Sequence, residues 1–381
     1  MPTRRLRWAV ITGEYPWQPG GVSEYTRMVA TGLAEAGDEV HIWAPASRLS
    51  TPADPGVNVH RLPGHFGSRA LVTLDRALSR MPYDRILVQY VPQAFGRKGM
   101  NLPFCLWLAS RRRCALWAMF HEVAYPYDWR QSPRHNLLAL VTRAMASLVA
   151  RAAQKIFVSI QAWEPLLTRL SFGRSRPVVW LPVPSNLPTK VCNAAVAAAR
   201  ARSSERSATI VGHFGTFGSQ VAKLMEAVLP PLLMADVNRV GMLLGRGSAR
   251  FANGLVQICP QLNARLIVND DCSNERAATH LAACDILVQP YVDGASGRRT
   301  SLMAGLALGR PIVTNSGPLT ETLWRDSQAV MLVSGAAPSA LVSAAQALLA
   351  DAAGRTILGI RAAELYRSRF AIEHTLRELR S

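Results

Sequence analysis

The sequence predicts an α/β protein made of two doubly wound domains. Two observations carry this prediction. Short apolar runs alternate with longer helical stretches along the whole chain, and this alternation stops and then restarts near the middle. A chain of 381 residues, of which 49% are hydrophobic and 18% charged, can bury a core in each of two domains.

The first half opens with a strand, a helix and a second strand. The apolar run at 8–12 is followed by helical spacing over 22–37, where Gly37 is a typical helix stop, and then by a strand at 39–45. Further apolar runs predict strands at 85–91, 115–123, 155–160 and 178–183. We therefore expect residues 1–190 to form the first domain.

The alternation stops in an Ala/Arg/Ser-rich passage and then resumes. Residues 191–207 are expected to be a linker, and residues 208–365 the second domain. Its predicted strands are 208–215, 240–245, 264–270, 285–291 and 310–315. The last helical stretch breaks near 366–370, so residues 366–381 are expected to return to the first domain.

Composition limits the class of protein. Charged residues or proline interrupt every apolar stretch before it reaches the length of a membrane-spanning helix, and the apolar run near the N-terminus is too short for a signal peptide. The six cysteines form no CxxC pair, which fits a reducing cytoplasm: Cys105, Cys114, Cys192, Cys259, Cys272 and Cys284. A cytoplasmic protein is expected, with neither a metal site nor a cofactor.

The formal net charge of +18 lies mostly in the first half of the chain. Such a field can attract nucleic acid, an anionic membrane leaflet or an anionic acceptor. An alternative interpretation is that arginine merely replaces lysine on solvated faces. If the charge does serve a membrane surface, the protein is peripheral at the inner face of that membrane.

Glycines follow the first predicted strand. Gly20 and Gly21 stand before the first helix, where backbone amides can approach an anion closely. Ligands of open α/β sheets bind at the carboxyl ends of strands, so this loop is well placed for a phosphate. By itself the pair also fits an ordinary turn.

A second loop combines glycines with two arginines at a helix start. Its members are Gly294, Gly297, Arg298, Arg299, Thr300 and Ser301. Two cations are unfavourable at the positive end of a helix, so we expect an anion beside them. A diphosphate fits this requirement through charge-assisted hydrogen bonds. The alternative is a pair of solvated surface arginines.

His121 ends the apolar run that starts at residue 115, and Glu122 follows it. Its place at a strand end makes catalysis or substrate contact about as plausible as a buried structural role. The segment after it contains Tyr125, Tyr127 and Trp129, aromatic residues suited to stacking on a sugar acceptor. They fit loop packing equally well.

Several segments in this order resemble the family-four retaining glycosyltransferases, whose fold is GT-B. They are PGGVSEYTRMVATGLAEAGDEVHIWAP, His121, GHFGTFG, MLLGRG and SLMAGLALGRPIVTNSGPLTE. The resemblance implies two Rossmann-like domains facing across a cleft. It implies donor phosphate contacts from Gly20, Gly21, Gly215 and Thr216, a nucleotide contact from Gly245 and Arg246, and His121 beside the transferred sugar.

One departure from the family pattern concerns its paired glutamates. Counting back from Gly309 places Ser296 and Ala304 at those positions, and Asp293 could replace the first carboxylate by a loop shift. The ribose contact, and with it the choice of nucleotide, is therefore in question. The chain also resembles a bacterial subset with similar segments at Val88–Pro92 and Ser296–Leu302.

The resemblance implies transfer of a sugar from a nucleotide-sugar donor to a glycan, lipid-linked or small-molecule acceptor, without a metal. Arg298 and Arg299 would stabilise the leaving diphosphate. The donor pocket would be completed by Asp293, Gly294, Ser296, Gly297, Thr300 and Ser301, and the acceptor would be met by Glu122, Tyr125, Tyr127 and Trp129. One rival is a sugar-nucleotide epimerase using Glu122 and Glu321. The other, a nucleic-acid-binding protein, lacks any recognised motif, so nucleic acid is not expected.

Overall fold

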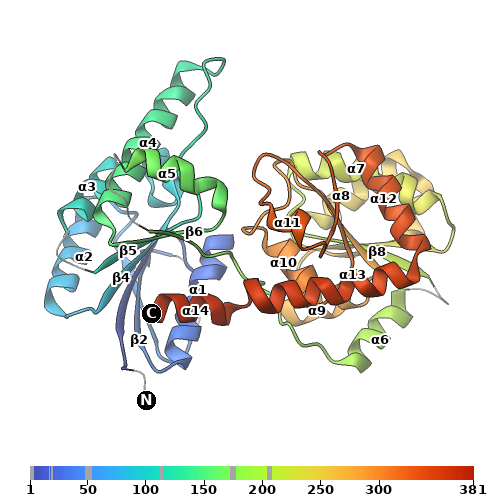
Figure 1. The fold of residues 1–381 in the computed structure, drawn as a ribbon, viewed down its shortest axis with the longest axis horizontal. Helices are drawn as coiled ribbons and strands as arrows, with labels where there is room; N and C mark the ends of the chain where they lie inside the picture. Colours follow the sequence, from blue (N-terminus) through green and yellow to red (C-terminus); the bar gives the residue numbers. More distant parts are fainter. Residues whose placement is uncertain are drawn as a thin grey trace. The chain divides into compact units, whose positions relative to one another are not determined.

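The computed structural model describes residues 4–16, 18, 20–47, 54–111, 115–171, 177–203 and 208–381. The chain divides into two compact units (Figure 1). Unit 1 comprises Met1–Pro182 and Ile372–Ser381, and unit 2 comprises Val183–Ala371. The chain thus passes from unit 1 to unit 2 after residue 182, eight residues before the expected domain limit of 190.

Unit 1 is built on a seven-stranded parallel sheet in the order β3-β2-β1-β4-β5-β6-β7. The strands are β1 (Arg7–Thr12), β2 (Glu39–Pro45), β3 (Val57–Leu62), β4 (Arg85–Tyr90), β5 (Leu116–Phe120), β6 (Lys155–Val158) and β7 (Val178–Trp180). The helices are α1 (Gly21–Glu35), α2 (Ser68–Arg80), α3 (Leu102–Ser110), α4 (Pro133–Ala152), α5 (Glu164–Leu170) and α14 (Ile372–Arg380). Short 3₁₀ turns lie at Pro92–Phe95, Arg97–Gly99 and Gln161–Trp163.

The last helix, α14, packs on the first helix of the chain within unit 1. Arg380 pairs with the buried carboxylate of Asp38 at 3.2 Å, and Asp38 also accepts a hydrogen bond from Trp8 Nε1 at 3.0 Å. Lys155 on β6 pairs with Glu378 at 2.8 Å. These charged contacts fix the C-terminal helix against the sheet of the first unit.

Unit 2 is built on a six-stranded parallel sheet in the order β10-β9-β8-β11-β12-β13. The strands are β8 (Thr209–Phe214), β9 (Arg239–Leu244), β10 (Leu266–Asn269), β11 (Ile286–Gln289), β12 (Ile312–Asn315) and β13 (Met331–Val333). The helices are α6 (Asn193–Ser203), α7 (Ser219–Met234), α8 (Ser248–Ile258), α9 (Asn274–Ala282), α10 (Thr300–Ala307), α11 (Leu323–Asp326), α12 (Pro338–Ala350) and α13 (Ala352–Leu365). A 3₁₀ turn occupies Pro260–Arg265, and a π-helical turn occupies Tyr366–Phe370 after α13.

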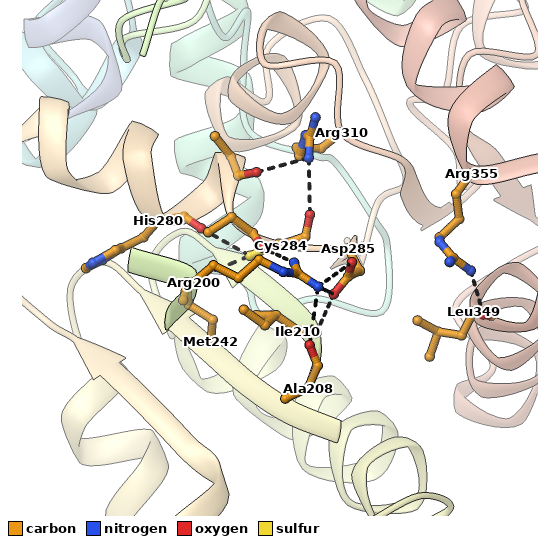
Figure 2. A network of polar contacts seen from close by, with 12 residues as sticks. Arg200, Ala208, Ile210, Met242, His280, Cys284, Asp285, Arg310, Leu349 and Arg355 are labelled. Carbon is orange, nitrogen blue, oxygen red and sulfur yellow. Dashed lines mark hydrogen bonds and ion pairs between the residues drawn. The ribbon is translucent and has the colours of Figure 1, made fainter. Parts of the chain in front are cut away.

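A polar network ties α6 to this sheet (Figure 2). Arg200 of α6 donates two hydrogen bonds to Asp285, at 2.9 and 3.0 Å, and one to the carbonyl of Ala283 at 2.8 Å. Asp285 also accepts the backbone N–H of Ile210 at 2.7 Å. Residues 193–203, expected to belong to a linker, therefore form a helix of unit 2. Residues 204–207 of that expected linker lie outside the described part.

The structure confirms the predicted α/β class and every predicted strand. Two strands escaped the sequence analysis, β3 and β13, and both lie at sheet edges. In β3 polar residues interrupt the apolar ones, and β13 is apolar but only three residues long, so each gives a weaker signal than a central strand does. In the described part of the chain, no helix is long and apolar enough to cross a membrane, and Cys105, Cys192, Cys259, Cys272 and Cys284 are free. Cys114 lies outside that part.

Candidate functional site

Each sheet has a point where the strand order reverses. In unit 1 it lies between β1 and β4, and in unit 2 between β8 and β11. The carboxyl ends of the strands beside such a point bound the crevice in which open α/β sheets bind ligands. Most predicted site residues follow β1, β5, β8, β9 or β11 directly. Each unit therefore presents its own group of candidate residues.

The loop between β11 and α10 brings the two predicted arginines to one carboxylate. Arg298 donates a hydrogen bond to Asp293 Oδ2 at 2.6 Å, and Arg299 contacts Asp293 Oδ1. The guanidinium of Arg299 also lies over the ring of Tyr291, 4.8 Å from its centre. Both arginines are half-buried. They are therefore not solvated surface arginines, and the anion expected beside them is supplied by the protein itself.

Thr300 and Ser301 begin α10 directly after the arginine pair, and both are half-buried. Ser301 Oγ lies 2.8 Å from the hydroxyl of Tyr291. Tyr291 is further fixed by its backbone N–H, which donates to Asn315 Oδ1 at 2.8 Å. Burial raises the pKa of Tyr291 to about 12, so its hydroxyl stays protonated and can donate or accept a hydrogen bond. Sequence reasoning missed Tyr291 and Asn315, although both lie at strand ends.

Glu321 is a buried carboxylate that contacts the backbone of the same loop. Its two oxygens accept the N–H of Gly297 at 3.0 and 3.2 Å, and Oε2 accepts Nε1 of Trp324 at 2.7 Å. Burial raises the pKa of Glu321, while the hydrogen bond from Gly297 opposes that rise. The residue therefore fixes the backbone just before Arg298, and its oxygens are occupied by these donors.

The positions of the family's paired glutamates are both buried. Ser296 and Ala304 have no measurable exposure, and Ser296 Oγ has no hydrogen-bond partner among the described residues. Asp293, the expected replacement for the first glutamate, instead binds the two arginines. Neither side chain at these two positions offers a carboxylate to a ribose.

Two glycines let neighbouring loops of this site touch backbone to backbone. Gly294 has φ +87°, and a Cβ there would lie 2.2 Å from both the nitrogen of Gly317 and Oγ1 of Thr320. Gly245 has φ +104°, and a Cβ there would lie 2.4 Å from the carbonyl oxygen of Gly215. A side chain is therefore excluded at both positions by contact and by conformation.

The contact at Gly245 joins the two loops that the sequence analysis assigned to phosphate and nucleotide. Phe217 donates its backbone N–H to the carbonyl of Arg246 at 3.1 Å, which holds the second loop against the first. Thr216 and Arg246 are both exposed at this junction. The structure thus brings Gly215, Thr216, Gly245 and Arg246 together at the ends of β8 and β9.

His213 lies just before this junction and was not singled out from the sequence. Its Nδ1 donates to the carbonyl of Val288 at 2.8 Å, and its Nε2 has no hydrogen-bond partner among the described residues. A Cβ on Gly215 would be 4.0 Å from that Nε2. Burial lowers the pKa of His213 to about 4, so the ring is neutral near pH 7. Its strand-end position was the signal that could have identified it.

In unit 1, the glycine loop after β1 already contains a negative charge. Glu14 is hydrogen-bonded by the backbone N–H groups of Val22 and Ser23 in the first turn of α1. A Cβ on Gly20 would lie 2.6 Å from this carboxylate, whereas one on Gly21 would meet nothing within 4 Å. Burial raises the pKa of Glu14, and the two N–H groups oppose that rise. The anion position expected for a phosphate is thus occupied by Glu14.

His121 directly follows β5 and is buried. Its Nε2–H donates to Gln89 Oε1 at 2.8 Å, and its ring packs edge-on against Tyr25 with centres 4.9 Å apart. Burial lowers the pKa of His121 to about 3, so the imidazole is neutral at ordinary pH. With Nε2 donating, Nδ1 is the atom that can accept a hydrogen bond.

The predicted acceptor residues lie in the chain between β5 and α4. Glu122 accepts a hydrogen bond from Gln93 at 2.8 Å, and the carbonyl of Tyr125 accepts one from Arg143 of α4 at 2.7 Å. Tyr125 is half-buried, whereas Tyr127 is 53% and Trp129 78% exposed. The last two therefore do not pack the loop.

Comparison with protein families gives two matches that together cover most of the chain. Residues 20–184 match a glycosyl transferase 4-like domain, and residues 206–351 match the glycosyl transferases group 1. A comparison with curated proteins found no match.

Solved structures are similar over almost the entire chain. A sucrose-phosphate synthase from Thermosynechococcus elongatus is 18% identical, with a TM-score of 0.73 and coverage of 98% of this chain and 97% of that one. A glycosyltransferase from Rickettsia africae is 12% identical, with a TM-score of 0.73 and coverage of 99% and 97%. HepE from Anabaena, solved with UDP and glucose, is 16% identical, with a TM-score of 0.70 and coverage of 98% of both chains.

Proposed function

We propose that this protein, which belongs to the group 1 glycosyltransferases and has their GT-B fold, transfers a hexose from a nucleoside diphosphate sugar with retention of configuration. Glycosyl transfer itself follows from the two family matches. The donor class, the stereochemistry and the residues involved are the proposal. UDP-glucose is the first donor to test, because HepE of Anabaena was solved with UDP and glucose.

The observation that carries the proposal is the convergence of Arg298 and Arg299 on Asp293 after β11. Two guanidinium groups and the start of α10 form a cationic site at the reversal point of the unit 2 sheet. A diphosphate can replace Asp293 beside them and, because it has more oxygen atoms, accept more charge-assisted hydrogen bonds than Asp293 does. The arginines would then stabilise the charge that develops on the leaving group.

Retention follows from attack by the acceptor hydroxyl on the face from which the diphosphate leaves. The acceptor oxygen forms the new bond to the anomeric carbon as the bond to the diphosphate breaks, and the hydroxyl proton passes to the departing phosphate oxygen. In this scheme the two guanidinium groups supply the positive charge, and neither a metal nor a protein nucleophile takes part.

His121 would contact the donor sugar without exchanging a proton. Its pKa of about 3 makes the ring a poor general acid at neutral pH, and its Nε2 is engaged by Gln89. Nδ1 would accept a hydrogen bond from a sugar hydroxyl. The glycine loop of unit 1 is assigned a smaller part in phosphate binding, because Glu14 occupies its helix N-terminus.

The epimerase alternative is not favoured. Its two candidate carboxylates, Glu122 and Glu321, already accept hydrogen bonds from Gln93 and from Gly297 and Trp324. Glu321 is also buried.

The test starts with nucleotide binding. Thermal unfolding with UDP, GDP, dTDP and ADP should show one preferred nucleotide that raises the Tm. At a hundredfold excess over its Kd, this nucleotide should add about 2.7 kcal/mol to the free energy of unfolding. The matching sugar nucleotide is then assayed with candidate acceptors, and the anomeric configuration of the product is read by NMR, with and without EDTA. An inverted product, or activity lost on chelation, would contradict the proposed mechanism.

A further inference from the structure

In unit 1, the exposed apolar side chains gather at one place. Among its described residues, six large hydrophobic side chains are about half exposed or more, and four of these lie between residues 127 and 140: Tyr127, Trp129, Leu137 and Leu140. The loop that enters α4 and the first turns of that helix stand clear of the rest of unit 1 (Figure 1). We call residues 125–143 the projecting segment.

The outer face of α4, from Arg134 to Ala144, is more apolar than polar. Arg134, Leu137, Leu140 and Ala144 are exposed and recur every three or four residues, which places them along one side of the helix. A helix of a soluble protein normally turns polar residues to solvent. This side of α4 therefore resembles a surface that contacts a binding partner.

The charge of the surface is almost entirely positive. Helices α3 and α4, which pack together, contain no Asp or Glu, and Asp128 is the only carboxylate between residues 123 and 152. The two exposed aromatic rings each carry an arginine: Arg130 lies 5.0 Å from the ring centre of Trp129, and Arg143 lies 5.9 Å from that of Tyr127. Aromatic rings beside cations suit the headgroup level of a bilayer.

A strained turn adds two more cations beside the projecting segment. Four consecutive residues have positive φ: Gly96 at 80°, Arg97 at 51°, Lys98 at 55° and Gly99 at 83°. Residues with side chains rarely adopt this conformation, yet Arg97 and Lys98 do so and are exposed. A Cβ on Gly99 would lie 3.7 Å from both Tyr125 and Leu138, so the turn abuts the projecting segment. Backbone strain of this kind is characteristic of functional positions.

A hollow of about 490 Å³ opens within the projecting segment. It is lined by Tyr125, Pro126, Gln131, Ser132 and His135. Neither an acidic side chain nor a lysine or arginine lines it, so it suits an uncharged part of a lipid.

We propose that the projecting segment and the Arg97–Lys98 turn dock unit 1 on an anionic phospholipid bilayer. Trp129, Tyr127, Leu137 and Leu140 enter the interfacial region, and Arg97, Lys98, Arg130, Arg134 and Arg143 bind lipid phosphates. A protein partner would have to present an acidic patch here, whereas an anionic bilayer offers phosphates to the cations and an interfacial region to the exposed rings. This inference rests on unit 1 alone and is independent of the sugar donor.

The experiment measures binding of the full chain to vesicles by flotation. Phosphatidylcholine vesicles are compared with vesicles that also contain phosphatidylglycerol, at low and high salt. We expect binding to the anionic vesicles only, weakened by salt. Tryptophan fluorescence should be quenched by brominated lipid, and the quenching should be mostly lost in Trp129→Phe.

Two variants separate the apolar part from the charged part. Tyr127→Ser with Trp129→Ser should weaken vesicle binding about tenfold or more, because it removes the exposed rings. Arg97→Asn with Lys98→Asn should weaken it about fivefold for each cation, and asparagine tolerates positive φ, so the Tm should not fall. The matched controls in unit 2 are Ile258→Ser, which removes a side chain of a residue that is 72% exposed, and Arg250→Gln, which removes an exposed cation.

Three results would overturn the proposal. They are equal binding to neutral and anionic vesicles, no binding at low salt, and controls that weaken binding as much as the test variants do. Sedimentation of the free protein tests for a second copy as the occupant. A dimer that Trp129→Ser dissociates, without vesicle binding by the parent, would assign the surface to self-association.

Discussion

Replacing Arg298 with alanine separates a phosphate-binding role from a structural one. In the structure its guanidinium pairs with Asp293 at 2.6 Å, and the two side chains are 20% and 24% exposed. The pair is only partly exposed, but Asp293 keeps Arg299 as a partner in the variant, so we expect folding to lose about 1 kcal/mol or less. If a donor diphosphate replaces Asp293 as the partner, the variant also loses a charge-assisted hydrogen bond worth about 1.5 to 3 kcal/mol in the transition state.

The two free energies differ enough to be measured side by side. We expect Arg298→Ala to lower kcat/KM for the donor about 10- to 150-fold, while urea unfolding shows a loss of about 1 kcal/mol or less. Initial rates of nucleotide release give the first value. Arg325→Ala is the control, because Arg325 is an exposed arginine of the same unit. A variant with the parent kcat/KM, or one destabilised by several kcal/mol, would refute the reasoning.

The remaining predictions concern a histidine contact, a loop and a pH window. His121→Ala should lower donor turnover at least tenfold beyond any loss explained by unfolding, and a variant that melts much earlier yet keeps its activity per folded molecule would disprove the sugar contact. Gly294→Ala should lower the free energy of unfolding by about 2 kcal/mol or more, since its Cβ would lie 2.2 Å from Gly317 and φ is +87°. Gly254→Ala in α8, where a Cβ meets nothing within 4 Å, should be neutral or stabilising, and equal urea midpoints for the two variants would contradict this. The folded pKa values of His121 and His213, about 3 and about 4, lie below the ordinary 6.5. Below pH 6.5 the unfolded chain then binds more protons than the folded chain, so each histidine should lower the free energy of unfolding by about 2 to 3 kcal/mol as the pH falls from 6.5 to 4.5. In urea titrations at several pH values, His213→Gln should make the free energy of unfolding depend less steeply on pH.

The sequence was sufficient for the class of fold because central strands of a parallel sheet are buried on both faces. β1, β4 and β8 therefore appear as continuous apolar runs, and their order along the chain indicates a doubly wound arrangement. The edge strand β3 does not have this property, although the edge strands β7 and β10 are apolar runs. β3 contains Asn58, His60 and Arg61 and was missed, because only one of its six residues is fully buried and polar side chains are tolerated there.

That the candidate residues lie at strand ends could be predicted from the sequence, but the side chains that they contact could not. Strand-end loops with glycines and arginines identified the arginine pair after β11 and the loop before α1, because topology alone brings strand ends to one edge of the sheet. Which anion lies beside each loop depends on the conformation of the loop, and the sequence pattern does not specify that conformation. Only the tertiary structure shows that Asp293 binds the arginine pair and that Glu14 occupies the start of α1.

Exposure was likewise decided by the fold. The sequence of α4 is rich in Leu, Ala and Val, which by itself fits a helix buried on several sides. Most residues of its second half are buried, and the helix packs on α3, α5 and β5, while Leu137 and Leu140 in its first half face solvent. A helix that extends past the elements it packs against leaves one end exposed, and the periodicity of its apolar residues does not show which turns are exposed. The sequence fixes which residues are apolar, and the packing of α4 against its neighbours determines which of them are left for a partner.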